Sequence, residues 1–402
     1  MNLIFLTLSD IWGLQGRGIY IDLIRKFRDE GHSVYVVSPT ERRYHKSEGL
    51  LKKDGINILK VRTLNIRKTN AIEKGLGTLM IEGQCKKAVI KYLGNIQFDL
   101  ILYSTPPITF ANVVRYLKKQ NPESVSYLLL KDIFPQNAVD IGLFSKNSLF
   151  YWYFRRKEKT LYKISDYIGC MSPANVDFIR RNNSYYPADR VEVAPNSIDL
   201  IENNEVVDRN FIRKQYGLPL DIPIFIYGGN LGKPQGIDYL IQCLEKNLDR
   251  RDCFFLVVGG GTEFGKLQDW YNGHSGKNVK LMAGLPKKAY DQLVRSCDVG
   301  LIFLDHRFTI PNYPSRLLSY LEYKMPIICA TDVNTDIGKM AQENGYGYWC
   351  ESCNSADFTA LVDKMLQSNM SEMGEHGYQF LKANYLVEHT YQAIIKHCSK
   401  LR

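Results

Sequence analysis

Glycine-rich loops hold the residues of this sequence that could do chemistry on an anionic ligand. The first loop follows the apolar run 3–8, leads into a helical pattern that begins at Tyr20, and contains Gly13, Gly16, Arg17 and Gly18. Glycines let a backbone approach a phosphate or sugar closely, and a helix N-terminus favours negative charge. The spacing is not Gly-x-Gly-x-x-Gly, and no acidic residue at the second predicted strand could contact a ribose, which disfavours a nicotinamide dehydrogenase. A plain tight turn remains the alternative for this loop.

A second loop of this kind opens the second half of the chain at residues 227–236. Its residues that could contact a ligand are Gly229, Asn230, Gly232 and Lys233. We expect Lys233 to meet a diphosphate as a point charge, while backbone amides near Gly229 and Gly232 supply neutral donors. A third glycine run, with Gly260 at its centre, follows another apolar run. Several such loops on one domain favour a nucleotide site.

The most specific segment is residues 311–328, which follows the predicted strand 299–304. Ser315 stands where a helix cap belongs, and Ser319 and Glu322, four and seven residues later, should share its face of the helix. The N-terminus of this helix could therefore face the phosphates of a donor. A capped amphipathic helix without any ligand explains the segment equally well when it is taken alone.

The basic residues are concentrated in the first half of the chain. Residues 1–200 carry 30 Lys+Arg and 19 Asp+Glu, a net charge of +11, whereas the remainder carries a net charge of −1. One cluster, residues 151–163, alternates basic and aromatic side chains, a combination that suits an anionic membrane surface or a lipid diphosphate. No recognition motif of a nucleic-acid-binding module is present, so we expect no nucleic-acid partner. A solvated basic face without a partner is the remaining alternative.

Length and composition predict a two-domain protein of the cytoplasm. A chain of 402 residues exceeds the size at which one core stops growing. The N-terminal apolar run carries no preceding basic residue, and no uncharged apolar run is long enough to cross a membrane, so the protein is expected to be soluble or peripheral. The nine cysteines are scattered, as expected of buried thiols, and the single Cys-x-x-Cys pair at 350–353 lacks a histidine cluster or second pair beside it.

Apolar runs alternate with helical patterns along the whole length, which indicates repeated βαβ units and an α/β fold with parallel sheets. The first series runs to about residue 200, the segment 197–223 is rich in Asn, Asp and Pro, and a second series follows. We therefore predict two doubly wound domains, 1–200 and 201–384, with a helix at about 385–402 that packs back on the first domain. Ligands should bind at the carboxyl ends of the strands, in a cleft between the domains.

The segment Pro314-Ser315-Arg316-Leu317-Leu318-Ser319-Tyr320, followed by Met-Pro-Ile-Ile at 325–328, resembles the donor-site helix of family 4 glycosyltransferases. These are retaining enzymes of the GT-B fold, which has two Rossmann-like domains. Further segments agree in order along essentially the whole chain: 16–32, 132–138 (Asp-Ile-Phe-Pro-Gln-Asn-Ala), Ser172-Pro173 and 195–199. The match is most similar to the branch that builds capsular polysaccharide and O-antigen chains, including N-acetylfucosaminyltransferases.

Two departures from the family pattern affect the expected site. The two glutamates usual in the family align with Pro311 and Ser319, so Glu322 is a candidate substitute for the carboxylate that binds the donor ribose. The usual arginine and lysine that hold the diphosphate align with Asn230 and Gln235. The nearest cations, Lys233 and Arg316, are therefore expected to do this work, and the donor-binding set becomes Gly229, Asn230, Gly232, Gly260, Gly284, Leu285, Pro314, Ser315, Leu317, Ser319 and Glu322.

The resemblance implies transfer of a sugar, an N-acetylated hexosamine or deoxyhexosamine, from a UDP-sugar with retention of configuration. The departing phosphate would take the acceptor proton, and no metal or other cofactor is expected because no Asp-x-Asp pair suits one. The acceptor, a polyprenyl-diphosphate-linked glycan, would lie at the inner face of the plasma membrane. It would contact the first domain at Gly16, Arg17, Gly18 and Lys131, with Asp132 as a catalytic residue. The alternatives are a non-hydrolysing UDP-sugar 2-epimerase of the same fold and a non-catalytic nucleotide-sugar-binding protein.

Overall fold

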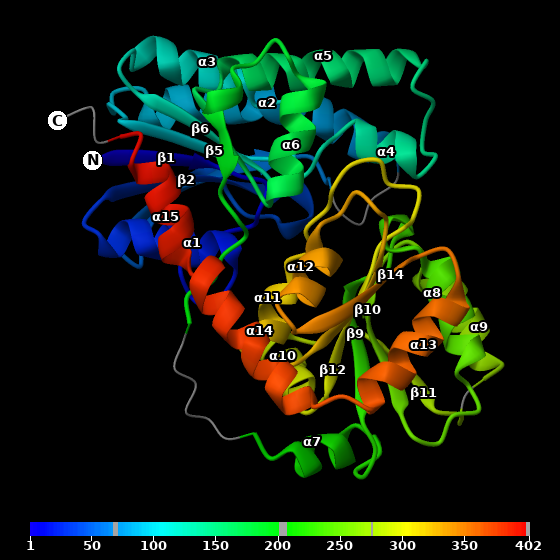
Figure 1. Ribbon diagram of the computed structural model, residues 1–402. Coiled ribbons are helices and arrows are strands. Elements are labelled where there is room, and N and C mark those ends of the chain that lie inside the picture. The colour runs from blue at the N-terminus through cyan, green and yellow to red at the C-terminus, as the bar shows by residue number, and fades with distance from the viewer. Residues whose placement is uncertain (67–70, 201–206, 275, 399–402) are drawn as a thin grey trace. The chain divides into compact units, whose positions relative to one another are not determined.

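The computed structural model describes residues 1–66, 71–200, 207–274 and 276–398, and the chain divides into two compact units (Figure 1). The first unit comprises Met1–Asp199 together with Leu386–Arg402, and the second comprises Leu200–Tyr385. Residues 201–206 of the predicted linker and 399–402 of the predicted terminal helix lie outside the described residues.

The first unit is built on an eight-stranded sheet with the order β3-β4-β2-β1-β5-β6-β7-β8. All neighbours are parallel except β3, which runs antiparallel to β4 at the sheet edge. The central strands are apolar runs because both faces of a parallel sheet are covered by helices. The strands are β1 (Asn2–Leu6), β2 (Ser33–Glu41), β3 (Gly49–Lys53), β4 (Ile56–Thr63), β5 (Leu100–Ser104), β6 (Val125–Leu130), β7 (Tyr167–Cys170) and β8 (Val191–Val193).

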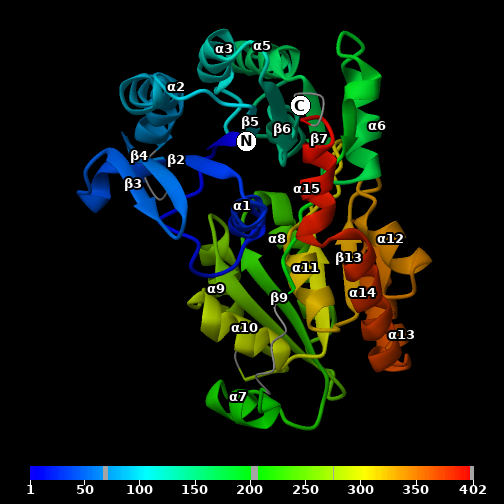
Figure 2. The ribbon, with the colours of Figure 1, turned by 90° about the vertical axis from the view of Figure 1, so that its left-hand side faces the viewer.

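The last helix of the chain belongs to this unit. Val387, Tyr391 and Ile394 of α15 enter the same core cluster as Leu23 and Phe27 of α1, and Figure 2 shows the two helices side by side. The helices of the unit are α1 (Ile19–Asp29), α2 (Ala71–Leu93), α3 (Ala111–Gln120), α4 (Gln136–Asp140), α5 (Leu149–Ile164), α6 (Pro173–Asn182) and α15 (Val387–Ile395), with 3-10 turns η1 (Arg42–Tyr44) and η2 (Ala188–Arg190).

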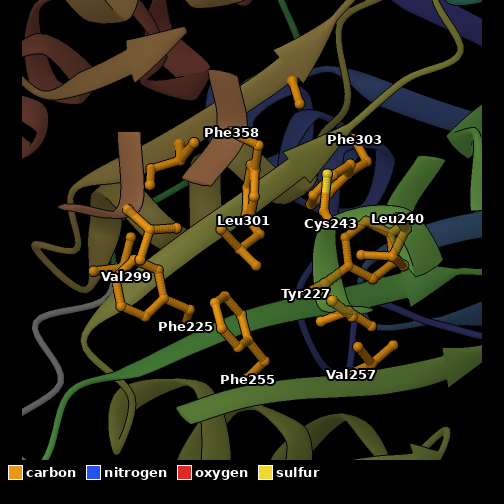
Figure 3. Packing of buried hydrophobic residues seen from close by; sticks show 14 of the residues in the cluster. Phe225, Tyr227, Leu240, Cys243, Phe255, Val257, Val299, Leu301, Phe303 and Phe358 are labelled. Carbon is orange, nitrogen blue, oxygen red and sulfur yellow. The ribbon is translucent and has the colours of Figure 1, made fainter. Parts of the chain in front are cut away.

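The second unit has a six-stranded parallel sheet with the order β11-β10-β9-β12-β13-β14. Aromatic rings fill the space between this sheet and its helices, and Figure 3 shows Phe225, Phe255 and Phe303 packed with Phe358 of α13. The strands are β9 (Ile224–Asn230), β10 (Phe254–Gly260), β11 (Val279–Ala283), β12 (Val299–Phe303), β13 (Ile327–Thr331) and β14 (Gly347–Glu351).

Helices connect consecutive strands of the second unit, as the alternation of patterns predicted. One of them, α7, lies inside the segment predicted to be a linker, where Asp208 caps it by accepting a hydrogen bond from the amide of Phe211 (2.9 Å). The helices are α7 (Arg209–Gln215), α8 (Ile237–Lys246), α9 (Phe264–Asn272), α10 (Lys287–Arg295), α11 (Arg316–Glu322), α12 (Ile337–Glu343), α13 (Ser355–Leu366) and α14 (Met370–Asn384), with the 3-10 turn η3 (Lys233–Gln235).

Two strands, β3 and β14, lack the apolar runs from which the sequence predicts strands, and both lie at sheet edges. β3 exposes most of its side chains and has no alternation of apolar and polar residues, and β14 is short and only partly buried. Edge strands need few apolar residues because only part of their surface is covered, so the hydrophobic pattern does not reveal them. In the described part of the chain, no helix has both the length and the hydropathy that crossing a bilayer requires.

Candidate active site

The strand order of the second unit places its ligand crevice between β9 and β12. From β9 the chain proceeds to β10 and β11 on one side, and then returns to β12 on the other side of β9. At such a reversal the loops that follow the two strands diverge, and ligands bind there, outside the carboxyl ends. The loop after β9 is the predicted second glycine loop, and the loop after β12 leads to α11 with its Arg316.

Side chains within the glycine loop brace one another. The hydroxyl of Tyr227 donates to the carbonyl of Asn230 (2.7 Å), and the Oε1 atom of Gln235 accepts from Asn230 Nδ2 (2.8 Å) and from the amide of Gly232 (3.1 Å). The two positions at which the resembling family carries cations are therefore occupied by a neutral pair that holds the loop. The amide of Gly232, predicted as a ligand donor, already has an acceptor in this arrangement.

The glycines of this region allow two loops to approach each other. A Cβ atom on Gly259 would lie 1.9 Å from the carbonyl oxygen of Gly229, and one on Gly261 would lie 2.3 Å from that of Leu231. Gly229 also has a φ of +120°, which L side chains rarely adopt. A Cβ atom on Gly260 would meet nothing within 4 Å, so Gly260 borders open space.

Arg316 lies over the start of this loop. Its guanidinium carbon is 4.4 Å from the ring centroid of Tyr227, and a Cβ atom on Gly229 would lie 3.6 Å from that carbon. The Nη1 atom of Arg316 is buried and has no hydrogen-bond partner, and no carboxylate pairs with this side chain among the described residues. Arg316 as a whole is partly exposed, but a cation with a buried nitrogen and no counter-ion is costly, so this guanidinium is arranged to meet an anion.

Phenol groups surround Arg316 in place of carboxylates. The hydroxyl of Tyr320 accepts a hydrogen bond from the amide of Gly228 (3.3 Å) and donates to the carbonyl of Ile226 (3.2 Å). The hydroxyl of Tyr290 stands 1.7 Å from the position of a Cβ atom on Gly228, and burial raises the pKa of Tyr290 to about 12. Burial alone would lower the pKa of Arg316, but the neighbouring phenol oxygens outweigh it and hold this pKa above its ordinary value.

Lys233 begins the 3-10 turn η3, and its side chain is exposed. The turn ends at Gly236 (φ +59°), where a Cβ atom would lie 3.4 Å from the Cα atom of Asp305, and the amide of Asp305 donates to the carbonyl of Pro234 (3.0 Å). The loop after β12 is thus joined directly to the glycine loop. Among the described residues, Lys233 has no ion-pair partner.

The structure also places Arg307 at this junction, which the sequence did not predict. Its Nε and Nη2 atoms donate to the two carboxylate oxygens of Asp305 (2.9 and 2.7 Å), and this cation contributes to lowering the pKa of Asp305 against the opposing effect of burial. The Asp-His-Arg run after an apolar strand was the available signal. Because Asp305 neutralises Arg307, Arg307 is not a candidate cation for an anionic ligand.

Other predicted donor residues lie on or near α11. Pro314 is partly buried and Ser315 is exposed. Ser315 occupies the predicted N-cap position of α11, but its backbone is helical (φ −65°, ψ −15°) and its side chain makes no cap hydrogen bond. Leu317 is fully buried, so its side chain packs in the interior and offers no surface to a donor. Ser319 lies one turn beyond Arg316 and is partly exposed.

Glu322 is the last residue of α11, about 9 Å along the helix axis from Arg316 at 1.5 Å per residue. Glu322 therefore lies at the opposite end of α11 from Arg316. Gly284 and Leu285 follow β11 at the same sheet edge as the glycine runs, where a Cβ atom on Gly284 would lie 3.9 Å from the carbonyl carbon of Gly259. These two residues remain candidates for a nucleotide contact.

In the first unit, Lys131 and Asp132 follow β6 and are anchored by Thr105, whose Oγ1 atom accepts from both of their amides (2.9 and 3.1 Å). The Lys131 ammonium donates to the carbonyl of Ala194 (3.1 Å), and Asn137 donates to Asp132 (2.6 Å). Burial lowers the pKa of Lys131 to about 7 and raises the pKa of Asp132 to about 6. Both groups therefore titrate near neutral pH, as residues of functional sites often do.

The glycine loop of the first unit is held by its own cations. Arg25 donates to the carbonyls of Leu14 (3.0 Å) and Gly16 (2.7 Å), and Arg17 donates to the carbonyl of Asp199 (2.7 Å). Gly16 has a φ of +89°, and Cβ atoms on Gly16 and Gly18 would meet nothing within 4 Å. The predicted acceptor residues Gly16 and Gly18 thus border open space, whereas the guanidinium of Arg17 contacts the backbone.

No group of three or more potential metal ligands occurs among the described residues. The cysteines are free thiols, and all are buried except Cys353.

Comparison with known proteins relates most of the second unit to glycosyl transferases. Residues 208–380 match the family model "Glycosyl transferases group 1". The probable glycosyltransferase WbjE of Pseudomonas aeruginosa is 22% identical over 265 residues, which are 64% of each chain. The putative colanic acid biosynthesis glycosyl transferase WcaI of Escherichia coli is 23% identical over 160 residues, 39% of this chain and 38% of that one. The chain thus spans about two thirds or less of the length of these curated relatives.

Similarity of structure extends over the full length. The crystal structures of Alr3699/HepE from Anabaena in complex with UDP and with UDP-glucose each superpose with a TM-score of 0.69, covering 100% of both chains at 15% identity. Because the alignment covers both full lengths, it confirms the predicted fold of two Rossmann-like domains. At 15% identity the similarity shows the fold alone. Residues 208–380 are thus similar to the group 1 glycosyl transferases, and the chain as a whole has the GT-B fold.

Proposed function

We propose that this protein is a retaining glycosyltransferase that moves a sugar from a UDP-sugar to a lipid-linked glycan in surface polysaccharide synthesis. The observation that carries the proposal is the buried, unpartnered Nη1 atom of Arg316 beside the glycine loop after β9. A guanidinium with no carboxylate partner at the carboxyl edge of a parallel sheet suits the diphosphate of a nucleotide.

The donor diphosphate would lie against Arg316 and the exposed Lys233. Arg316 presents its guanidinium next to Gly229, so phosphate oxygens could approach it without meeting a side chain from that residue. Lys233 stands at the other end of the same loop, on the η3 turn. The UDP and UDP-glucose complexes of HepE, whose fold this chain shares, support a uridine donor.

Cleavage of the bond between the sugar C1 atom and the phosphate oxygen leaves negative charge on the departing UDP. Fixed cations stabilise that charge because they are already in position and need no reorganisation when it develops. The acceptor hydroxyl attacks C1 from the side of the leaving group, its oxygen forms the new bond, and its proton passes to the departing phosphate. This course retains the configuration at C1, and the work required of Arg316 is to stabilise UDP as it leaves.

On the first unit, the acceptor would bind near Lys131, Asp132, Gly16 and Gly18. Lys131 with a pKa of about 7 is partly protonated at neutral pH and could contact an acceptor phosphate, while Asp132 with a pKa of about 6 is mostly ionised and could orient the acceptor hydroxyl. The colanic acid role in the name of WcaI supports a polysaccharide acceptor. We propose a polyprenyl-diphosphate-linked glycan, presented at the inner face of the plasma membrane, and an N-acetylated sugar as the transferred group.

The decisive experiment incubates the protein with radiolabelled nucleotide sugars, with and without a polyprenyl-diphosphate-linked glycan. We expect label to enter the lipid fraction from a UDP-sugar and only when the acceptor is present. Appearance of the epimerised donor without labelled glycolipid would instead identify a 2-epimerase, and binding of the donor without either product would identify a non-catalytic binding protein.

Nucleotide specificity can be measured independently by thermal shift with UDP, GDP, ADP and CDP. A ligand at one hundred times its dissociation constant stabilises the folded state by about 2.7 kcal/mol. We expect UDP to raise the melting temperature most, and a larger shift with another diphosphate would contradict the assignment of the base while leaving the transfer reaction open to the first experiment.

A further inference from the structure

Helix α5 of the first unit presents a stripe of large apolar side chains to solvent. Leu149, Phe150 and Trp152 are 87%, 69% and 67% exposed, and Tyr153 is also exposed. All four lie in the first two turns of the helix, just after Ser148, which caps it by accepting a hydrogen bond from the amide of Tyr151 (3.1 Å). Exposed apolar patches on this scale mark interaction surfaces.

The stripe continues as a row of cations along the same side of α5. Arg156, Lys159 and Lys163 are exposed, and their spacing of three and four residues places them in line with Trp152. The single acidic residue of the helix, Glu158, is 2% exposed and is paired with Arg155. The outward side of α5 is thus apolar over its first turns and positively charged over the rest.

Hollows flank this row. One, of about 370 Å³, is lined by Trp152, Arg155, Arg156, Lys159, Thr160 and Lys163, and another, of about 290 Å³, is lined by Ala111, Asn112, Tyr153, Arg156, Lys157 and Thr160. Arg156 lines both hollows, and no carboxylate pairs with it among the described residues. Each hollow therefore combines an aromatic ring with cations that could meet phosphate oxygens.

We propose that the outward side of α5 docks on an anionic phospholipid bilayer, with Leu149, Phe150 and Trp152 entering the interface and Arg156, Lys159 and Lys163 contacting lipid phosphates. Helices with Trp, Phe and Leu beside a basic face bind in the plane of the membrane interface, where Trp and Tyr are also enriched. Nucleic acid would match the cations, but its phosphate backbone offers no apolar phase for Leu149 and Phe150. This proposal rests on the proposed function in one respect, because a lipid-linked acceptor requires contact with the membrane.

The test measures co-sedimentation of the full-length protein with vesicles of phosphatidylcholine alone or with 30% phosphatidylglycerol. We expect binding to the anionic vesicles only, at least tenfold weaker in 0.5 M NaCl because added salt screens exposed charges. The variant R156E/K159E/K163E should bind at least tenfold more weakly. The control variant K214E/K246E/K339E changes the same number of exposed lysines or arginines on the second unit and has the same net charge, so it should bind like the unaltered protein.

The apolar part of the surface is tested by a second variant, L149S/F150S/W152S. These side chains are exposed, so the replacements should leave the melting temperature and the thermal shift caused by UDP unchanged while weakening vesicle binding at least tenfold. Brominated lipids should also quench the tryptophan fluorescence of the unaltered protein more than that of W152F.

Three results would overturn the proposal: equal binding of the charge-reversal variant and its control, equal binding to neutral and anionic vesicles, or tighter binding to a duplex oligonucleotide than to anionic vesicles. Each of these leaves UDP binding and transfer untouched, so failure of the docking surface is distinguishable from failure of the proposed function.

Discussion

The glycine loops that follow the first strand of each unit differ in what their cations do. In the first unit, Arg25 donates to the carbonyls of Leu14 and Gly16 and pairs with the buried Asp22 (3.0 Å), so its charge is used within the loop. In the second unit, Asn230 and Gln235 brace the loop as neutral groups, and Arg316 keeps a buried nitrogen without a partner. The two glycine-rich loops therefore have different roles. The loop beside Arg316, a cation without a carboxylate partner among the described residues, is the one suited to bind an anion.

Replacement of Arg316 is the most direct test of this difference between the two loops. We expect R316A to lower kcat/KM for the donor at least about 100-fold, or about 2.7 kcal/mol at 1.36 kcal/mol per factor of ten, because the departing diphosphate loses its fixed cation. Steady-state kinetics and UDP titration by calorimetry measure the effect. The matched variant R25A should instead lower the melting temperature and leave UDP affinity unchanged. Transfer by R316A at an unchanged rate would refute the proposed diphosphate contact.

The packing of the loops gives the next contrast. A Cβ atom on Gly259 would stand 1.9 Å from the carbonyl oxygen of Gly229, so G259A should destabilise the protein by about 1–3 kcal/mol through overpacking. Gly259 lies in β10 and packs against the loop after β9, whereas a Cβ atom on Gly18 of the first loop would meet nothing within 4 Å, so G18A should stay within about 0.5 kcal/mol. Urea unfolding measures both values, and equal effects would mean that the loop after β9 is no more tightly packed than the first loop.

Lys233 should matter less than Arg316, since an exposed cation is well solvated. We expect K233A to raise the KM for the donor about three- to tenfold, with an effect that shrinks as ionic strength rises because salt screens exposed charges. Kinetics at 0.05 and 0.5 M NaCl measure this dependence, with K246A as a control. A loss that is independent of salt would instead place Lys233 in a desolvated contact.

The smallest effect concerns pH and the first unit. Burial lowers the pKa of Lys131 to about 7, so its ammonium is protonated below that pH and becomes neutral as pH rises through it. The KM for a diphosphate-linked acceptor should therefore rise severalfold between pH 6 and 8, while the KM for the donor stays constant. K131R should remove this dependence because a guanidinium remains protonated. An unaltered pH profile in K131R would show that Lys131 does not bind the acceptor.

The fold could be predicted from the sequence because buried parallel strands produce continuous apolar runs, such as 100–104 and 299–304. The order of these runs and the helical patterns between them determined the fold class, and the structure confirms it. Edge strands such as β14 were not predicted, because a partly buried strand does not need a continuous apolar run.

The details of the site were less predictable, because they depend on contacts between residues far apart in the sequence. The position of Arg316 over Tyr227 and the approach of Tyr290 to Gly228 join three different elements, and no local spacing encodes them. Likewise, Asn230 and Gln235 replace the cations of the family pattern and form a hydrogen bond that holds the loop. The alignment of residues alone did not reveal this role.

The return of the chain at Leu386 has a consequence for biosynthesis on the ribosome. Ile198 and Leu386 form a β-bridge, and Ser197 and Thr390 share a hydrogen bond (2.7 Å), so segments almost two hundred residues apart complete one core together with α1. The unit that is translated first must therefore wait for α15 to emerge before its apolar surface is covered. Residues 200–385 are continuous in the sequence and have no such dependence, so they can finish folding earlier than the unit that precedes them.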